Sequence, residues 1–296
     1  MRKYAKSPFY LTSVNEWAIW RQKKLDKQIK SIDELRVIID DPAAPSAAES
    51  RRLCRRCDHF NLALFRTEPR CMNSAAKFTA LCAAVGLRHI DRNIAAGESG
   101  ISAIEATPGI DPRYIPYTSR QLSWHTDGYY NAADRQVKSW ALYCVRQSLQ
   151  GGESELLDHE LLYLFMRDEE PAMISALMQP DVMTIPANIE HGREIRAAST
   201  GPVFAIDDDG RLRMRYSARS RNIQWKNDRK TRQAVKFMHD LLSSPNAPII
   251  RYRLHPGEGI ISNNVLHRRS SFENGEAAEH QRLLWRARFY DAVSCA

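Results

Sequence analysis

The chain has 296 residues, enough for one large domain or two small ones, and 43% of them are hydrophobic, so it can bury a sizeable core. No stretch approaches the roughly eighteen uninterrupted apolar residues of a transmembrane helix. The formal net charge is +8, but the positive residues are scattered and accompany no nucleic-acid recognition motif, so we expect solvated surface charge and small-anion binding instead of DNA or RNA binding.

The N-terminus and the cysteines indicate a cytoplasmic protein. Residues 1–8 lead into polar sequence without the hydrophobic core of a signal peptide. None of the six cysteines has companions at the paired spacing of a structural zinc site, and Cys54 and Cys57 form a lone CxxC in an Arg-rich segment. We therefore expect reduced thiols without a function.

The first 50 residues have the pattern of an addition to the main fold. Residues 14–25 place Trp17 and Trp20 in helical spacing, and residues 40–46 have the composition of a linker. The two tryptophans must be buried, either against the main domain or against a second subunit, and the sequence leaves both open. We predict a helical extension and linker over residues 1–50 and a single main domain over residues 51–296.

Hydrophobic periodicity assigns the elements of the main domain. Helices are predicted over residues 48–60, 74–85, 159–166, 171–178 and 229–243. Strands are predicted over residues 61–66, 138–146, 155–157, 211–216, 250–254 and 282–290. The sequence thus predicts a mostly β fold with peripheral helices.

The stretch from Ser123 to Tyr130 carries a candidate metal site. In an extended segment, His125 and Asp127 project to the same side. An imidazole, a carboxylate and a second imidazole form the facial triad that holds non-haem Fe(II) and leaves three positions open. His267 is the candidate for the second imidazole.

A His-x-Asp pair alone is weak evidence for a metal site. With nine histidines, the chain contains a second such pair, His89-Ile90-Asp91, and either pair could be a surface His beside an unrelated Asp. The second pair follows the helix predicted over residues 74–85, and glycines lie just beyond it. We therefore expect it to lie in a loop.

The last predicted strand has arginines on one face. Alternation along residues 282–290 places Arg282, Arg286 and Arg288 on one side and the apolar residues Leu283, Trp285, Ala287 and Phe289 on the other. Arginines that point regularly to one side of a strand face either solvent or a bound anion.

Several motifs, taken in their order along the chain, are more specific than any one of them alone. They are Trp124-His125-Thr126-Asp127, Gly151-Gly152-Glu153-Ser154, Pro256-Gly257-Glu258-Gly259, the run from Asn264 to Phe272 and Arg282-Leu283-Leu284-Trp285-Arg286. From about Leu53 to Asp291, the chain resembles the taurine dioxygenase-like (TauD/TfdA) family of Fe(II)/2-oxoglutarate-dependent oxygenases. The resemblance implies a double-stranded β-helix, or jelly roll, with helices outside and the metal inside one open end.

The resemblance also implies roles for individual residues. His125, Asp127 and His267 would bind iron, and Arg282 would bind the distal carboxylate of 2-oxoglutarate with Ser154 assisting. Arg286 matches a second arginine near the cosubstrate. The segment between His267 and Arg282 is a few residues longer than in compact relatives, which leaves open which of the two arginines is the main clamp.

The implied reaction is consistent with the chemistry of these side chains. The far carboxylate of 2-oxoglutarate needs a cation, and arginine offers a fixed two-pronged donor. The reaction would consume O₂ and convert 2-oxoglutarate to succinate and CO₂ while a substrate C–H bond is hydroxylated or desaturated. Retention of the Asp127 carboxylate argues against halogenation. One departure is Arg268, which stands where the family often has glycine.

The substrate is less well defined by the sequence. The substrate pocket is one possible place for Tyr129, Tyr130 and Asn131. The alternative for the two tyrosines is that they are aromatic residues of the pocket rim or of the core. The nearby arginines Arg113, Arg120 and Arg135 are candidates for contacts with a small acidic metabolite.

Partners other than a small-molecule substrate are not expected. The sequence predicts neither nucleic acid nor a membrane as a partner, and it leaves open a homo-oligomer. Three other classes of function remain as alternatives: a cupin-like metal enzyme that does not use 2-oxoglutarate, a non-catalytic protein that retains the fold, and a basic nucleic-acid-binding module. The first predicts no succinate formation, the second would usually lack a ligand, and the third predicts steeply salt-dependent binding.

Overall fold

The computed structural model describes residues 7–92, 99–106, 109, 115–219 and 223–295. The chain divides into two compact units. The first unit contains residues 1–28, 124–136 and 157–249, and the second contains residues 29–123, 137–156 and 250–296. Within the described residues, no helix is long and apolar enough to cross a membrane.

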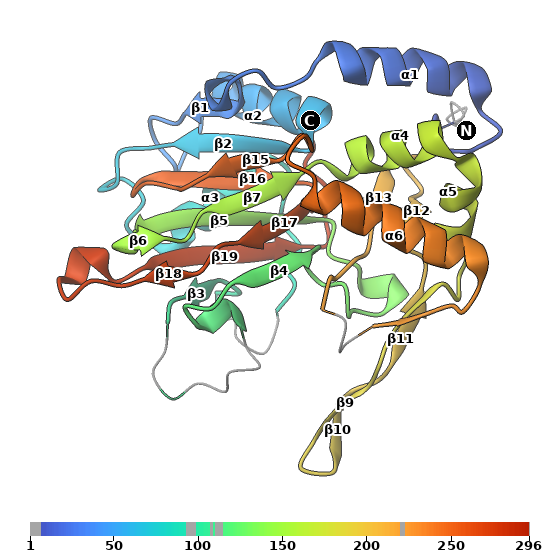
Figure 1. Cartoon of the computed structure of the whole chain (residues 1–296). Helices are drawn as coiled ribbons and strands as arrows, with labels where there is room; N and C mark the ends of the chain where they lie inside the picture. The colour runs from blue at the N-terminus through green and yellow to red at the C-terminus, as the bar shows by residue number, and fades with distance from the viewer. Residues whose placement is uncertain (1–6, 93–98, 107–108, 110–114, 220–222, 296) are drawn as a thin grey trace. The chain divides into compact units, whose positions relative to one another are not determined.

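The second unit is built on a six-stranded sheet (Figure 1). In spatial order its strands are β1 (Arg36–Ile38), β2 (Leu62–Arg66), β16 (Glu258–Ser262), β5 (Ser139–Arg146), β19 (Leu283–Phe289) and β3 (Ser102–Ile104). All neighbours are antiparallel except β1 and β2, which pair in parallel. The sheet is therefore assembled from segments far apart in the sequence.

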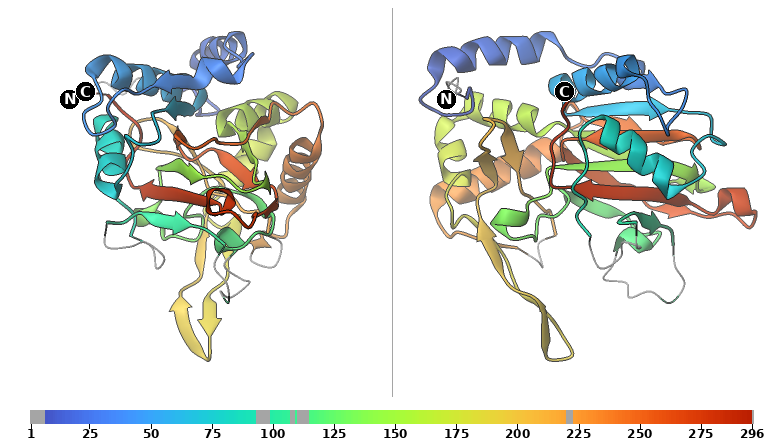
Figure 2. Two further views of the ribbon diagram at one scale, coloured as in Figure 1. Left: turned by 90° about the vertical axis from the view of Figure 1, so that its left-hand side faces the viewer. Right: turned by 180° about the vertical axis from the view of Figure 1, so that it is seen from behind.

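Two helices pack on one face of this sheet. They are α2 (Ala47–Phe60) and α3 (Ala75–Ala84), and their buried residues form one core cluster with inward residues of β5 and β19 (Figure 2). A second cluster lies on the opposite face, where Trp140 and Leu284 meet Leu156 and Leu254. Because both faces are covered, all five residues of β16 are buried, with Ile261 in the first cluster and Ile260 in the second.

Capping residues fix the ends of the first of these helices. Ser46 and Glu49 form a capping box at the start of α2, where each side chain accepts from the other's backbone N–H. Asn61 ends the helix in a left-handed conformation with φ 57°. This tight end lets β2 begin at Leu62 and run back under the helix.

The strand β19 shows the predicted alternation. Trp285, Ala287 and Phe289 contact the helix-covered cluster, and Leu284 belongs to the cluster on the other face. Arg288 is buried, and its Nη2 lies 2.5 Å from Oδ2 of Asp91. Asp91 also accepts from the hydroxyl of Tyr290 at 2.7 Å. The second His-x-Asp motif thus supplies a structural ion pair.

Two smaller sheets accompany the six-stranded sheet. A four-stranded sheet has the order β15 (Ile250–Tyr252), β7 (Ser154–Leu157), β17 (Leu266–Arg269) and β4 (Leu122–His125). A two-stranded sheet pairs β18 (Phe272–Glu273) with β6 (Gln150–Gly151). These short strands carry three of the predicted site residues, His125, Ser154 and His267.

The first unit combines helices with three small sheets. Its α-helices are α1 (Val14–Asp26), α4 (His159–Glu169), α5 (Pro171–Leu177) and α6 (Arg229–Ser243). Its strands are β8 (Met183–Ile185), β9 (Asn188–Glu190), β10 (Arg193–Arg196), β11 (Ser199–Gly201), β12 (Phe204–Ile206), β13 (Leu212–Met214) and β14 (Gln224–Trp225). The hairpin formed by β9 and β10 extends away from the helices of this unit (Figures 1 and 2).

Helix α1 packs on α4 through aromatic and charged contacts. Trp17 lies 5.7 Å, between ring centroids, from Tyr163, and the Arg167 guanidinium lies 4.1 Å from the Trp17 ring. Lys24 forms ion pairs with Asp158 and Glu160, both at 2.6 Å. Within the chain itself, Trp17 is therefore buried and Trp20 is partly buried.

The cysteines contradict one expectation from the sequence. Cys54 on α2 and Cys295 form a disulfide that joins positions 241 residues apart, whereas reduced thiols had been expected throughout. Cys57, the other cysteine of the CxxC motif, is buried and is not part of a disulfide. The bond fixes the C-terminal segment to a helix of the second unit, so its role is structural.

Candidate functional site

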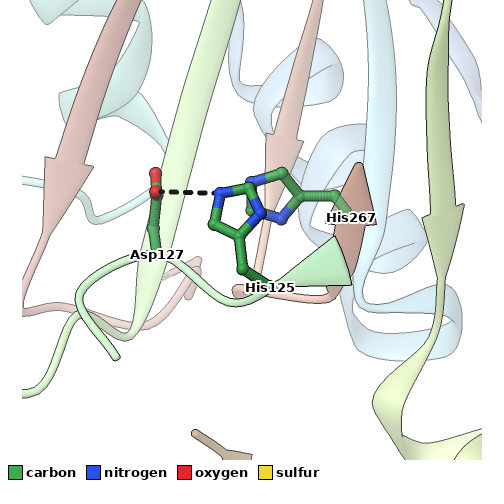
Figure 3. A group of neighbouring side chains, drawn as sticks. All are labelled: His125, Asp127 and His267. Carbon is green, nitrogen blue, oxygen red and sulfur yellow. Dashed lines mark ion pairs between the residues drawn. The ribbon is translucent and has the colours of Figure 1, made fainter. Parts of the chain in front are cut away.

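Three predicted ligands come together at the end of β4. His125 is the last residue of this strand, Asp127 follows two residues later, and His267 lies on β17, the neighbour of β4 in its sheet. Their ligand atoms all lie within 4.8 Å of one another. Figure 3 shows the two imidazoles side by side, with Nε2 of His125 3.8 Å from Oδ1 of Asp127. His125 and Asp127 are both buried.

The imidazole of His267 is held in one tautomer. Its Nδ1 lies 2.9 Å from the carbonyl oxygen of Val265, and because a carbonyl only accepts, Nδ1 carries the proton and donates. The lone pair therefore resides on Nε2, the nitrogen available to a metal. The indole of Trp140 packs against the same ring at 4.8 Å between centroids, which limits its rotation.

Backbone pairing fixes the segment that carries His125. Thr126 N donates to the carbonyl of Tyr216 at 2.9 Å, and Tyr216 N donates to Oγ1 of Thr126 at 3.0 Å. Gly128 then turns the chain with φ 68°, a conformation that favours glycine. The strand thus ends earlier than the sequence suggested, and Asp127 lies in the turn that follows it.

A pocket in the second unit gathers the predicted contacts of the cosubstrate. Arg282 and Ser154 line it together with Cys144, Arg146 and Arg253. The three arginines make the pocket strongly positive. Arg146 and Arg253 donate to backbone carbonyls, Arg146 to that of Gln281 and Arg253 to those of Ser148 and Leu149. Their hydrogen bonds hold these side chains in place without neutralising them.

Arg282 has an unsatisfied donor in this pocket. The residue is 6% exposed, and its Nη1 is buried without a hydrogen-bond partner among the described residues. Burial lowers the pKa of Arg282 to about 10, so the guanidinium is still charged at neutral pH. A buried cation with an open donor is costly unless an anion accepts from it. The arrangement therefore fits a bound carboxylate.

Two glycines make room for this arginine. A Cβ on Gly151 would lie 2.2 Å from the carbonyl oxygen of Ser271, and a Cβ on Gly152 would lie 3.3 Å from Nε of Arg282. Both glycines have positive φ, 68° and 78°. The Gly-Gly pair is thus needed where β6 approaches β18 and where the Arg282 side chain passes.

Arg286 occupies a different place from Arg282. It lies on β19 opposite Leu142 of β5 and Ser102 of β3, and it is partly buried. Arg286 does not line the pocket around Arg282. The structure therefore brings Arg282 and Ser154 together and leaves Arg286 outside that pocket.

The unusual Arg268 is accommodated by an acidic neighbour. Its Nη2 lies 2.9 Å from Oε2 of Glu155 on β7, which also pairs with Arg251 at 3.3 Å. This side chain projects to the opposite side of β17 from its neighbour His267. A large cation can therefore replace glycine here without entering the ligand cluster.

The predicted substrate contacts are partly committed to other interactions. The Tyr129 ring meets His125 edge-on at 6.5 Å between centroids, and Tyr130 meets Tyr129 at 5.2 Å. The Asn131 amide donates to the carbonyl of Arg135 at 2.9 Å, so it stabilises the turn. Of the arginines suggested for an acidic substrate, Arg135 and Arg120 are exposed, and Arg113 lies outside the described residues.

Two contacts of Arg282 were not singled out as site contacts from the sequence. The Phe272 ring centroid lies 4.9 Å from its guanidinium carbon, and the Asn274 side-chain oxygen accepts from its backbone N–H at 3.0 Å. Both residues lie in the segment between His267 and Arg282. The backbone N–H of Gly275 donates to the carbonyl of His280 at 3.3 Å, which closes the loop that leads into β19.

Comparisons with known proteins identify the family. The family model described as "Taurine catabolism dioxygenase TauD, TfdA family" matches residues 23–288. Uridine-5'-phosphate dioxygenase of Amycolatopsis sp is 29% identical over 175 residues, 57% of this chain and 61% of that protein. Gamma-butyrobetaine dioxygenase of Homo sapiens is 25% identical over 179 residues, 58% of this chain and 45% of that protein. The matches thus span only about half of these relatives' lengths.

Solved structures share the fold at low sequence identity. A complex of asparagine oxygenase with Fe(II), 2S,3S-3-hydroxyasparagine and succinate has a TM-score of 0.59 at 14% identity, covering 88% of this chain and 94% of that one. A taurine dioxygenase from Burkholderia xenovorans has a TM-score of 0.57 at 14% identity, covering 84% of each chain. With the family model matching nearly the whole length, the chain belongs to the TauD/TfdA family.

Proposed function

We propose that this protein is an Fe(II)- and 2-oxoglutarate-dependent dioxygenase that hydroxylates or desaturates an unactivated C–H bond of a small metabolite. The observation that carries the proposal is the cluster of two imidazoles and one carboxylate whose ligand atoms lie within 4.8 Å of one another. This donor set is the facial triad of non-haem Fe(II) oxygenases. The family and the solved structures that share the fold support it.

His125, Asp127 and His267 would hold the iron on one face. Nδ1 of His267 is engaged by the Val265 carbonyl, which presents Nε2 to the metal and raises the basicity of the ring. When bound, the ferrous ion, 2-oxoglutarate and O₂ supply the oxidation, in which loss of CO₂ and formation of succinate accompany attack on the substrate C–H bond. The carboxylate of Asp127 keeps the third protein position occupied, which favours hydroxylation or desaturation over halogenation.

Arg282 would be the main clamp for the distal carboxylate of 2-oxoglutarate. Its buried Nη1 has an open donor position, and Ser154 lines the same pocket. Arg286, the other candidate for the clamp, lies outside that pocket. The double-stranded β-helix expected from the family is part of the same proposal and is supported by the TM-scores of the solved structures.

Anaerobic spectroscopy tests the metal site directly. Addition of Fe(II) and 2-oxoglutarate to the purified protein should produce the weak visible charge-transfer band of the chelate. His267→Ala should abolish the band, because one of three ligands is removed. His239→Ala is the matched control, since His239 is exposed on α6 and should leave the band intact. An unchanged band in His267→Ala would remove this residue from the metal site.

Succinate release separates this function from a cupin-like enzyme that does not use 2-oxoglutarate. In the presence of O₂, the wild-type protein should form succinate when a panel of acids, amines and metabolites is supplied. Arg282→Gln should weaken 2-oxoglutarate binding by roughly tenfold or more, because a charge-assisted bidentate contact is lost. Turnover of a substrate without succinate, unaffected by Arg282→Gln, would favour the cupin-like enzyme.

A further inference from the structure

A row of aromatic rings leads from the ligand cluster to an arginine. The His125 ring contacts Tyr129, Tyr129 contacts Tyr130 edge-on, and the guanidinium of Arg196 lies 5.7 Å from the centroid of the Tyr130 ring. All four residues belong to the first unit. Arg196 ends β10, so it stands at the base of the extended hairpin.

Arg196 is held in place but its charge is not neutralised. Its Nη2 donates to the carbonyl of Pro186 at 2.8 Å and its Nη1 to that of Ala197 at 3.0 Å. Glu190 and Glu194 lie on the same hairpin, yet among the described residues no carboxylate forms an ion pair with Arg196. The side chain is partly buried, and burial lowers its pKa from the usual value.

A second arginine that pairs with no carboxylate of the described residues lies behind the same segment. Arg215 is 6% exposed and donates through Nε to the carbonyl of Tyr129 at 2.7 Å and through Nη2 to that of Ser199 at 2.6 Å. Its other hydrogen bonds go to the carbonyls of Met183 and Gly201 and to the hydroxyl of Ser199. Burial, and then the charge of Arg196, lower the pKa of Arg215 to about 10.

These two cations create a local excess of positive charge. Carbonyl oxygens accept from every guanidinium nitrogen of Arg215 and from Nη1 and Nη2 of Arg196. They do not cancel a unit charge, and the two arginines repel each other. Arg215 is enclosed by backbone and fixes Tyr129, whereas Arg196 is more accessible. An anion bound at Arg196 would relieve the repulsion.

We propose that Arg196 binds an anionic oxygen group of the primary substrate, a carboxylate or a phosphate, while Tyr129 and Tyr130 contact the part of the substrate between that group and the oxidised carbon. The inference rests on the proposed function and narrows its substrate class to acidic metabolites. Arg215 would be a positioning residue, because it acts through the backbone of Tyr129.

The proposal is tested by comparing the affinities of an acid and its neutral analogue. Anaerobic calorimetry with Fe(II) and 2-oxoglutarate present measures these affinities. The probes are uridine 5'-phosphate against uridine and gamma-butyrobetaine against its amide, followed by further acidic metabolites with their neutral analogues. At least one acid should bind about tenfold or more tightly than its neutral partner. Which pair shows the preference distinguishes a phosphate from a carboxylate.

Variants of two arginines on β10 test which residue causes the preference for the acid over its neutral analogue. Arg196→Gln should weaken binding of the preferred acid by about tenfold or more and so remove the preference over the neutral analogue. Arg196→Lys should retain part of this preference. Arg193→Gln removes the same charge from an exposed position on β10 and should change nothing. Thermal unfolding of each variant checks that the hairpin base is intact.

The outcomes separate this inference from the proposed function. An unaltered preference in Arg196→Gln, or no preferred acid in the panel, would overturn the role of Arg196. The chelate band is recorded on the same samples and should be present in the wild type and in Arg196→Gln. A missing band in the wild type would count against the oxygenase itself.

Discussion

The Phe272 ring lies against the guanidinium of Arg282, with 4.9 Å between the ring centroid and the guanidinium carbon. Arg269 approaches the same ring at 4.7 Å. Burial, followed by the charge of Arg282, lowers the pKa of Arg269 to about 9. The ring face, which carries partial negative charge, thus lies close to both cations and stabilises them, since no carboxylate of the described residues pairs with either.

Replacement of this ring should weaken 2-oxoglutarate binding. Phe272→Leu keeps the apolar volume but loses a cation–π contact worth about 1–2 kcal/mol, so we expect the dissociation constant to rise roughly 5- to 30-fold. The measurement is a titration of the anaerobic chelate band with 2-oxoglutarate. Phe272→Tyr keeps the ring and should bind like the wild type. Equal affinities in all three proteins would show that the ring does not support Arg282.

The ion pairs of Lys24 should contribute strongly to stability. The pKa of Lys24 is raised, since Asp158 and Glu160 outweigh the opposing effect of burial. Lys24→Met would leave two largely buried carboxylates without their shared cation, so we expect the free energy of unfolding to fall by about 3–5 kcal/mol. Urea denaturation followed by tryptophan fluorescence would report the change.

A neighbouring lysine supplies the control for this prediction. Lys23 is exposed on the same helix, so Lys23→Met removes an equal charge without touching Asp158 or Glu160. It should change the free energy of unfolding by less than about 0.5 kcal/mol. Similar losses in the two variants would mean that Lys24 acts only through net charge.

Thiol titration should reveal the disulfide between Cys54 and Cys295. Unfolded without reductant, the protein should expose four thiols, those of Cys57, Cys71, Cys82 and Cys144. After reduction it should expose all six. A count of six without reductant would show that the protein as isolated is reduced.

The stability of the protein should depend on the same bond. Cys295→Ser opens a loop of more than two hundred residues, and we expect it to lower the free energy of unfolding by roughly 2–4 kcal/mol. Dithiothreitol should destabilise the wild type by a similar amount and leave the variant unaffected. Cys71→Ser removes a free thiol and serves as the control.

The elements that the sequence predicted well are those with strong local patterns. Helix α6 spans Arg229–Ser243, the range predicted from its apolar periodicity. The three ligands His125, Asp127 and His267 could be proposed because their motifs are short and lie in a recognisable order. In the structure, their ligand atoms lie within 4.8 Å of one another.

The contacts that escaped prediction join distant segments through groups without a sequence pattern. The disulfide joins positions 241 residues apart, and spacing alone could not show which two of the six cysteines would pair. Arg215 is surrounded by carbonyl oxygens from several segments, and backbone acceptors are present at every position of a sequence. Only the folded chain shows which arginine has such partners and which has an open donor, as Arg282 does.

His159 should make the stability of the protein depend on pH below about 6.5. It is 1% exposed at the start of α4, and its Nε2 lies 3.1 Å from the carbonyl of Leu212. Burial lowers its pKa from the ordinary value of 6.5, although Asp158 and Glu160 act in the opposite direction. The folded state thus holds this ring neutral at a pH where the unfolded chain already binds a proton.

Because the unfolded state binds more protons in this range, the contribution of His159 is fully present above pH 6.5 and is lost as the pH falls toward the lowered pKa. His159→Gln keeps a donor for Leu212 and removes the titration. Between pH 6.5 and 5, the free energy of unfolding of the wild type should fall more steeply than that of the variant, by up to about 1.4 kcal/mol per pH unit. His239→Gln, at an exposed position, should follow the wild type. Urea denaturation of the metal-free proteins across this range measures the slopes, and parallel curves for wild type and His159→Gln would show that His159 titrates normally in the fold.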